Sequence, residues 1–383
     1  MKQLERRTWA EISLPDLEHN YRALRAMLAP GCRFLGVVKA NAYGHGAVRV
    51  AQKLEQLGAE YLAVACLGEA VELREAGIRA PILILGYTPA DCGGELLRYG
   101  LTQTIYDAGT ARAFSEAACR AGKRLRVHVK ADTGMSRLGW LCGGAALERA
   151  ADDIQAVCAL PGLEAEGIYT HFANADSDED YTMEQFTRFL DLLAELERRG
   201  VTFQIRHCAA SAAVLKYPCT HLDMVRPGIA LYGVGADAQR LDLRPVMSLK
   251  SSVSTIKTFD PGTDVSYGRT FRTQGRTRIG VLPIGYADGF FRGLSNRMSV
   301  VTAQGPAPQR GRICMDMSMI DLTGLPDVKV GDEVEIFGCR QRVDDLAAIL
   351  NTIPYELTCA VSKRVPRVYI EGGKIVERSL RLL

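Results

Sequence analysis

Residues 34–46 read Phe34-Leu35-Gly36-Val37-Val38-Lys39-Ala40-Asn41-Ala42-Tyr43-Gly44-His45-Gly46. The apolar run at 34–38 is typical of a short buried strand, and it brings a lysine to the carboxyl end of that strand. A lysine in this place is poorly solvated, which favours its neutral amine, and a neutral amine forms Schiff bases with carbonyl compounds. A lone lysine before a loop is more often a surface residue, so the rest of the chain must decide between the two interpretations.

Apolar runs alternate with amphipathic stretches through the first 240 residues. We expect eight strands, at residues 34–39, 61–65, 82–85, 102–106, 125–130, 163–171, 203–208 and 223–226. Strands that are apolar nearly throughout are buried on both faces of a parallel sheet. The pattern predicts an α/β fold with an N-terminal (β/α)8 TIM barrel, although an open doubly wound sheet gives a similar local pattern. Ahead of these strands, residues 8–12 alternate like a short strand, and Ser13 is placed to cap a helix.

Polar residues gather where the predicted strands end. They are Lys39, Lys130 with Arg137 just after it, His171, Ser211 and Arg226. The active sites of (β/α)8 barrels lie at the carboxyl face of the strands. Polar residues with a purely structural role would have no reason to choose that end, so their placement favours the barrel.

From about Leu241 the chain changes to strand patterns separated by turn signals. Strands are expected at residues 247–259, 277–283, 298–302, 317–322 and 333–337, with a closing hairpin over 367–378. Residues 343–350 are the one clear helix of this part. The sequence therefore predicts two domains, a barrel domain at residues 1–240 and a mostly-β domain at 241–383.

Composition limits the class of protein. A formal net charge of +3 is too small to indicate binding to nucleic acid or to a membrane surface. No apolar run approaches the roughly 20 residues of a spanning helix, and residues 1–7 lack the apolar core of a signal peptide. The eleven cysteines include no CxxC pair, so neither a disulfide framework nor a metal site is expected. These features predict a cytoplasmic protein with reduced thiols.

Seven motifs resemble those of the alanine racemase family, whose members depend on pyridoxal 5'-phosphate (PLP). They are VVKANAYGHG around Lys39, HVKADTGMSRLG around Lys130, THFANAD around His171, MVRPGIALYG around Arg226, SYGRTF around Tyr267, GYADG around Tyr286 and GRICMDM around Cys314. The motifs follow the family's order and cover nearly the whole chain. The resemblance implies a PLP-binding barrel followed by a β domain, and an isomerase that interconverts L- and D-alanine and supplies D-alanine for peptidoglycan.

Two catalytic residues follow from the resemblance. Lys39 would hold PLP as an internal aldimine and, once freed, would serve as one proton-transfer group. Racemisation exchanges a proton on both faces of the α-carbon, and the second base matches Tyr267. In the family this tyrosine reaches the site of the other subunit, so a homodimer with shared active sites is expected.

A tyrosine has an ordinary pKa of about 10 and needs assistance to act as a base near neutrality. The family provides a hydrogen-bonded chain, which matches His171 and Arg226 here. Arg226 would also face the pyridine nitrogen of PLP and keep it unprotonated, because arginine stays charged. The alternatives are a salt bridge from Arg226 to Asp223 and an ordinary core role for His171.

The remaining site residues are also carried over by resemblance. Arg137 would contact the cofactor's phenolic oxygen and the substrate carboxylate, beside a carbamylated lysine that matches Lys130. Asp316 is expected to be structural, and Ser211 has the alternative role of a helix N-cap. The phosphate would be bound by Tyr43, Ser211 and the amides of Gly228 and Ile229, the substrate carboxylate by the Met315 amide, and the substrate-access channel would be lined by Tyr286 and Arg312.

Two positions depart from the family pattern. Ala210 stands where an asparagine usually precedes Ser211, and Lys363 stands where a phosphate-binding tyrosine is common. A lysine supplies charge as a flexible point, which loosens selectivity for the smallest side chain. A racemase for serine or for several small amino acids is therefore an alternative. A PLP decarboxylase and a PLP-binding homeostasis protein are further alternatives that the paired Lys39 and Tyr267 motifs disfavour.

Overall fold

The computed structural model describes residues 7–235 and 241–379. They form two compact units. The barrel unit comprises Tyr21–Ala42 and Ala47–Leu231, and the β unit comprises the described residues up to Asn20, Tyr43–Gly46 and those from Tyr232 onward. The expected domain boundary after residue 240 adjoins residues 236–240, which lie outside the described part, as do residues 1–6.

Eight parallel strands form the barrel unit. Their order is β10-β2-β3-β4-β5-β6-β8-β9, with every neighbouring pair parallel. Amides of Asp223 and Arg226 donate to the carbonyls of Arg206 (3.1 Å) and Ala209 (2.9 Å), which joins β10 back to the β9 segment. The predicted (β/α)8 barrel is thereby confirmed. The strands are β2 (Arg33–Val37), β3 (Tyr61–Val64), β4 (Ile82–Ile84), β5 (Thr102–Ile105), β6 (Leu125–Asp132), β8 (Leu163–Tyr169), β9 (Ile205–His207) and β10 (Met224–Val225).

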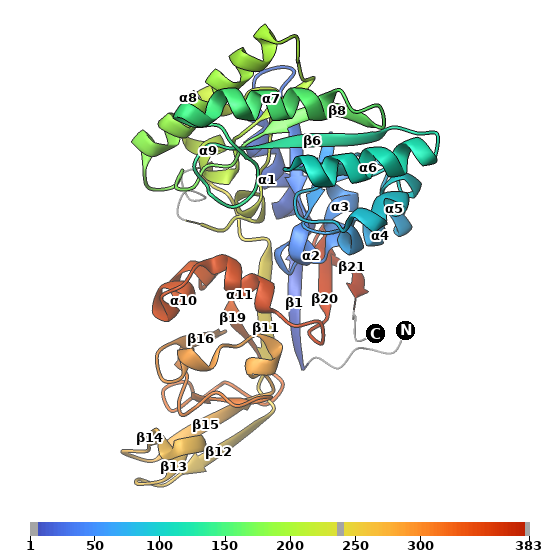
Figure 1. The fold of residues 1–383 in the computed structure, drawn as a ribbon. Helices are drawn as coiled ribbons and strands as arrows, with labels where there is room; N and C mark the ends of the chain where they lie inside the picture. Colours follow the sequence, from blue (N-terminus) through green and yellow to red (C-terminus); the bar gives the residue numbers. More distant parts are fainter. Residues whose placement is uncertain (1–6, 236–240, 380–383) are drawn as a thin grey trace. The chain divides into compact units, whose positions relative to one another are not determined.

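Helices alternate with these strands, and Figure 1 shows α6 and α7 beside β6 and β8. Asp107 and Asp178 cap α6 and α8, because their carboxylates accept the amides of Thr110 (2.8 Å) and Tyr181 (3.0 Å). The helices are α3 (Ala47–Gln56), α4 (Leu67–Glu75), α5 (Gly93–Arg98), α6 (Ala108–Arg120), α7 (Leu147–Cys158), α8 (Glu179–Arg198) and α9 (Ser211–Lys216). Of the helices in the described ranges, none has both the length and the apolar character needed to cross a membrane.

The β unit is built on a seven-stranded sheet in the order β17-β16-β19-β11-β1-β20-β21. Its strands are β1 (Thr8–Ser13), β11 (Met247–Ser252), β16 (Ser299–Thr302), β17 (Gly305–Pro308), β19 (Glu333–Phe337), β20 (Arg367–Glu371) and β21 (Lys374–Ser379). Smaller sheets pair β12 (Thr255–Phe259), β15 (Thr277–Leu282) and β18 (Ser318–Asp321), and β13 (Asp264–Val265) with β14 (Phe271–Arg272). The closing hairpin predicted near the C-terminus is confirmed as β20 and β21.

The expected strand at residue 8 is β1, an interior strand of this sheet that is antiparallel to β11 and parallel to β20. After it, Ser13 Oγ accepts the Asp16 amide (3.3 Å) at the start of α1 (Leu14–Ala26), as predicted. The long-range pairing of β1 cannot be read from its neighbours in sequence, because strand propensity is local and pairing is not.

Two expectations for this unit were wrong in detail. Residues 247–259 form two strands in different sheets, because the Val253 amide donates to Asp332 (2.9 Å) while the Ser254 amide donates to Val281 (2.8 Å). Helix α10 (Val343–Leu350) is confirmed, but a second helix, α11 (Pro354–Ala360), follows it. Its seven residues are too few for a helical repeat to be visible in the sequence.

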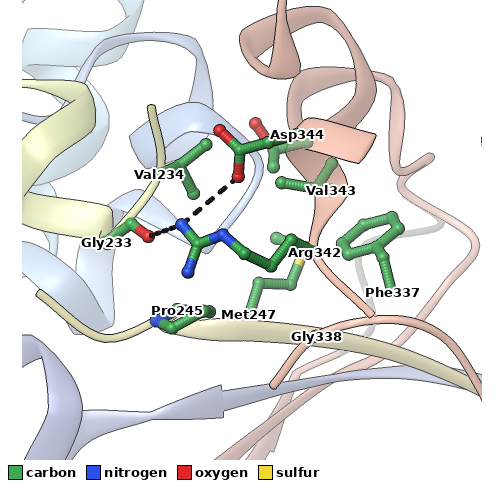
Figure 2. A pocket seen from close by; sticks show the side chains of 10 residues that line it. Gly233, Val234, Pro245, Met247, Phe337, Gly338, Arg342, Val343 and Asp344 are labelled. Atoms are coloured by element: carbon green, nitrogen blue, oxygen red, sulfur yellow. Dashed lines mark hydrogen bonds and ion pairs between the residues drawn. The ribbon is translucent and has the colours of Figure 1, made fainter. Parts of the chain in front are cut away.

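A small cavity in the β unit lies among Gly233, Pro245, Met247 and Phe337 (Figure 2). The guanidinium of Arg342 donates to the Gly233 carbonyl (3.3 Å) and pairs with Asp344 (3.3 Å) at this place. None of the lining residues is one of the predicted site residues. We interpret the cavity as a packing feature that joins the start of α10 to the strand-rich part of the unit.

Candidate active site

The lysine turn is held in a strained conformation. After Lys39 at the end of the β2 segment, Ala40, Asn41 and Ala42 all have left-handed backbone, with φ of 52°, 54° and 53°. Each costs about 1–2 kcal/mol in a residue with a Cβ, so such a run persists only where its surroundings hold it.

Two side chains supply that support. The Glu69 carboxylate accepts the amides of Ala40 (2.6 Å) and Ala65 (2.7 Å), which ties the lysine turn to the end of β3. Asn41 Oδ1 accepts the Ala47 amide (2.9 Å) at the start of α3. Backbone strain of this kind is concentrated at functional sites, where it sets the direction of a side chain.

Arg226 is the centre of the hydrogen bonds at the carboxyl edge of the barrel. Its Nη1 meets His207 Nδ1 (3.0 Å), and its Nη2 donates to the carbonyls of Thr170 (2.9 Å) and Cys208 (3.0 Å) and meets His171 Nδ1 (3.2 Å). Asp223 pairs with Arg206 instead (2.7 Å), so the salt bridge to Arg226 considered from the sequence does not form. The Nε–H of Arg226 has no hydrogen-bond acceptor among the described residues, and it is available to a ligand.

The contact with Arg226 determines the tautomer of His171. Guanidinium groups only donate, so His171 Nδ1 must accept and the ring proton lies on Nε2. Burial lowers the pKa of His171 well below its usual range, and the charges of Arg226, Lys130, Arg137 and Lys39 lower it further. His171 is therefore a neutral ring that offers an Nε2–H donor and stands among two arginines and two lysines. An ordinary core histidine does not have such surroundings.

Lys130 lies at the end of β6 and is almost fully buried. Burial, followed by the charge of Arg226, lowers the pKa of its amine to about 7, and its Nζ donates to the Ala131 carbonyl (2.7 Å). The neighbouring loop carries Arg137, whose charge also reaches Lys130. Asp132 shapes that loop by accepting the amides of Gly134 and Ser136 (both 3.0 Å). A neutral amine beside an exposed guanidinium suits reaction with a small electrophile such as carbon dioxide.

Ser211 and the segment after β10 form a cluster of polar backbone. The Ser211 hydroxyl accepts the amides of Gly228 (2.9 Å) and Ala230 (3.2 Å), which joins the start of α9 to η4 (Ile229–Tyr232). The hydroxyl thus bridges two segments and does not cap α9. The Ile229 amide, between those of Gly228 and Ala230, has no acceptor among the described residues and suits an anion such as phosphate.

The β unit carries the other predicted site residues. Tyr43 packs beside Tyr232 (ring centroids 5.0 Å) and Tyr355 (6.0 Å), and burial raises the pKa of its phenol, so it remains a neutral donor. Lys363 is exposed. Asp316 pairs with Arg364 (2.7 Å), in keeping with the structural role expected for it.

Tyr267 stands on a strained turn, η6 (Tyr267–Arg269), and its side chain is 72% exposed. Ser266 before it has φ 66° and ψ −178°, a conformation that is close to glycine-only, and Arg269 after it has φ 53°. The Ser266 hydroxyl donates to the Arg312 carbonyl (2.7 Å), which supports the turn. A strained turn that presents a tyrosine to the outside indicates a role in recognition or catalysis.

The turn is joined to two other predicted segments. Amides of Tyr286 and Ala287, in η7 (Tyr286–Asp288), donate to the carbonyls of Cys314 and Met315 (both 3.0 Å). Within the described residues the Met315 amide has no acceptor of its own. Tyr267, Tyr286, Arg312 and Met315 therefore belong to one connected group of loops, three of whose side chains are large, apolar in part and exposed. Such a surface is typical of an interface.

Sequence reasoning missed the supporting residues. Glu69, Asp132 and His207 were not singled out, nor was Gln185, which is fully buried and bonds the His171 carbonyl (3.3 Å) and the Ala173 amide (2.8 Å). Asp132 follows Lys130 closely and could have been found from its Asp-Thr-Gly turn pattern. The others come from distant segments and leave no local signal.

A (β/α)8 barrel whose carboxyl edge carries a lysine on a strained turn, two arginines, a buried second lysine and a neutral histidine is typical of an enzyme. Comparison with known proteins gives the particular family. The family model "Alanine racemase, N-terminal domain" matches residues 12–236, and "Alanine racemase, C-terminal domain" matches residues 246–369. This chain belongs to the alanine racemase family.

Individual relatives agree over nearly the full length. The chain is 46% identical to alanine racemase 2 of Caldanaerobacter subterraneus over 380 residues, covering 97% of both chains. It is 47% identical to the alanine racemase of Desulforamulus reducens, covering 94% of this chain and 98% of the relative. The solved alanine racemase of Clostridium difficile superposes with a TM-score of 0.95 at 40% identity, with both chains fully covered.

The buried amine of Lys130 predicts a pH-dependent stability. Its pKa is about 7 in the folded chain and about 10.5 when exposed, so the unfolded state binds the extra proton and parent stability rises with pH across that window. At pH 7.5 in buffer free of carbon dioxide, Lys130→Met should raise the free energy of unfolding by up to about 4 kcal/mol, from three pH units at about 1.4 kcal/mol each. The gain should shrink towards pH 10, as measured by urea unfolding.

Lys123→Met is the matched control, because Lys123 is exposed and its substitution removes the same charge. Its difference from the parent should not change between pH 7.5 and 10. A Lys130→Met difference that is equally independent of pH would show that the Lys130 amine is charged in the folded protein.

Proposed function

We propose that this protein is an alanine racemase that interconverts L- and D-alanine by two-base proton transfer with PLP, in a homodimer with shared active sites. The observation that carries the proposal is the barrel edge itself, where Lys39 follows β2 on a strained turn and Arg226 Nη2 meets His171 Nδ1 (3.2 Å). When bound, PLP supplies a conjugated electron-withdrawing system that acidifies the α-hydrogen of an amino acid.

The residues of the barrel fit this cofactor. Lys39 would supply the amine for its carbonyl, and the Ser211 hydroxyl and the Ile229 amide would bind its phosphate, with the Gly228 amide holding the Ser211 oxygen in place. The Nε–H of Arg226, which has no acceptor among the described residues, suits the pyridine nitrogen. Because arginine does not release its proton, that nitrogen remains unprotonated.

Proton exchange needs groups on opposite faces of the α-carbon. We assign the Lys39 amine to one face and the phenol of Tyr267 from a second copy of the chain to the other. The His171 Nε2–H is a donor without charge, and a hydrogen bond from it to the Tyr267 oxygen would stabilise the phenolate. Arg226 supports this donor by holding His171 Nδ1 as an acceptor.

The substrate carboxylate is assigned to the Met315 amide and the guanidinium of Arg137, while Tyr286 and Arg312 line its access channel. Relatives that match along nearly the whole chain carry the name alanine racemase, which favours alanine over serine as the substrate. We assign cofactor binding to the barrel domain, and we assign to the β domain the residues that complete the active site of the partner subunit. A cytoplasmic supply of D-alanine for peptidoglycan is the role we propose.

Isotope exchange tests the reaction. With PLP in heavy water, the parent should place deuterium at the α-position of both L- and D-alanine and should release no carbon dioxide. Lys39→Ala should lose the exchange by at least about a thousandfold, because one proton-transfer group and the cofactor's amine are removed together. Lys123→Met serves as the control and should exchange normally. Carbon dioxide release without exchange would identify a decarboxylase.

Mixed dimers test the sharing of sites. Lys39→Ala and Tyr267→Phe subunits should each be nearly inactive alone, but a mixed dimer contains one site with both groups intact. Random mixing should therefore restore roughly a quarter of the parent activity. A mixture of Lys39→Ala with the double variant has no intact site and should restore none. If the first mixture also stays inactive, the two groups do not act across subunits.

A carbamate on Lys130 is tested by carbon-13 NMR. Its neutral amine near pH 7 can attack carbon dioxide, and the resulting anion would orient Arg137. Labelled bicarbonate should give one additional protein-bound carbonyl signal that disappears in Lys130→Met and on acidification. The signal should persist in Lys123→Met. A parent spectrum without it would mean that Arg137 is placed by Asp132 and the loop alone.

A further inference from the structure

A chain of buried polar side chains runs away from Arg226 through the interior of the barrel. His207 meets Arg226 through Nδ1 (3.0 Å) and meets His128 Nδ1 through Nε2 (2.8 Å), and His128 Nε2 meets Glu166 Oε2 (3.3 Å). Both histidines are fully buried, and the Glu166 side chain is only 13% exposed. Tyr61, at the amino end of β3, donates its hydroxyl to the same carboxylate oxygen.

Only one arrangement of protons gives every hydrogen bond from Arg226 to Glu166 one donor and one acceptor. Arg226 can only donate, so His207 Nδ1 accepts and its proton lies on Nε2. His207 Nε2–H then donates to His128 Nδ1, which places the His128 proton on Nε2 and directs it to Glu166. A proton on His128 Nδ1 would face another N–H, so His128 is neutral. Burial lowers the pKa of both rings, in agreement with this assignment.

Local features of the backbone make room for these hydrogen-bonded side chains. The pairing of β6 with β8 shifts register between Val127 and His128, which leaves Glu166 as an extra residue in β8. Such a bulge re-aims a side chain. The next residue is Gly167, where a Cβ would lie 2.7 Å from the His128 ring. Tyr169 stacks on His207, with ring centroids 4.7 Å apart.

We propose that Glu166 and His128 are positioning residues, which act through His207 to hold the guanidinium of Arg226 with its Nε–H directed at the ligand. Arg226 sets the ring tautomers from one end of the hydrogen-bonded chain, and Glu166 is the terminal acceptor for the His128 Nε2–H at the other end. Without Glu166 this buried N–H has no acceptor, so the observed tautomers lose stability relative to the reversed set, in which His128 carries its proton on Nδ1 and His207 carries its proton towards Arg226. The inference rests on the proposed role of Arg226 at the cofactor.

The carboxylate also balances charge. Arg226 and Lys130 lie in surroundings where burial lowers the pKa of both, so a cation there is costly. Burial raises the pKa of Glu166, but hydrogen bonds from His128 and Tyr61 outweigh it and keep the carboxyl ionised. Two neutral imidazoles thus connect an anion and a cation that do not touch, which explains why the bulge, Gly167 and both histidines occur together.

Histidine tautomers are read directly by nitrogen-15 NMR of the full chain, without any ligand. In the parent, the signals of His128 and His207 should both correspond to neutral rings with the proton on Nε2. Glu166→Gln keeps an acceptor oxygen and should preserve this pattern. Glu166→Ala should move at least one ring towards the Nδ1–H form. Glu164→Ala, on the same strand, is the matched control and should change neither, because Glu164 has no side-chain hydrogen bond among the described residues.

The effect on Arg226 is read from the holoenzyme. In Glu166→Ala the visible absorption band of bound PLP should shift, and kcat should fall roughly tenfold with little change in KM, because misplacement by a fraction of an ångström weakens catalysis more than binding. Glu166→Gln should retain the parent band. If Glu166→Ala does not fold, the tautomers of the parent itself still test the proposal.

Two results would overturn the proposal. One is a charged or Nδ1-protonated His128 in the parent, and the other is a Glu166→Ala protein with parental tautomers and an unshifted band. A failure of the racemase assignment leaves the tautomer pattern intact, since that measurement needs neither cofactor nor substrate. The two failures are therefore distinguishable.

Discussion

The guanidinium of Arg226 is always a hydrogen-bond donor, and it lies in the buried interior, where an unsatisfied donor is costly. It is 3% exposed, and four acceptors surround it: two backbone carbonyls and two imidazole nitrogens. A buried charge is stable only when its hydrogen bonds are satisfied. Because arginine never accepts, its neighbours must present lone pairs, and this single condition sets the protonation of His171 on one side and of His207 on the other.

The tautomer of His171 determines which hydrogen-bond donor the barrel edge presents. His171 is left with an Nε2–H to offer, and burial, together with the neighbouring positive charge of Arg226, lowers its pKa and prevents it from taking up a proton. The arginines of the edge attract phosphate and carboxylate groups, which balance their charge when a ligand is bound. The edge is thus arranged for an anionic ligand before one arrives, and arrangement in advance lowers the cost of ordering during reaction.

Strain is placed at two turns, one in each unit. The turn after Lys39 holds four consecutive residues, Ala40 to Tyr43, at left-handed φ, and the turn at Tyr267 begins with Ser266 in a region that glycine normally occupies. Each is held by named hydrogen bonds, from Glu69 and Asn41 in one case and from Ser266 to the Arg312 carbonyl in the other. A proposed pair of proton-transfer groups therefore stands on backbone that resists reorientation.

Local pattern was enough to predict the eight barrel strands, the change to a β-rich part and the residues at strand ends, because burial on both faces and turn chemistry leave a mark within a few residues. Motif resemblance added Tyr267 and Met315, which no periodicity could have indicated. Contacts between residues far apart in the sequence could not be predicted in this way. The pairing of β1 with β11 and β20, the hydrogen bonds from Glu69 to the lysine turn and the tautomers of His128, His171 and His207 depend on which distant groups meet. Only the folded chain brings those donors and acceptors together.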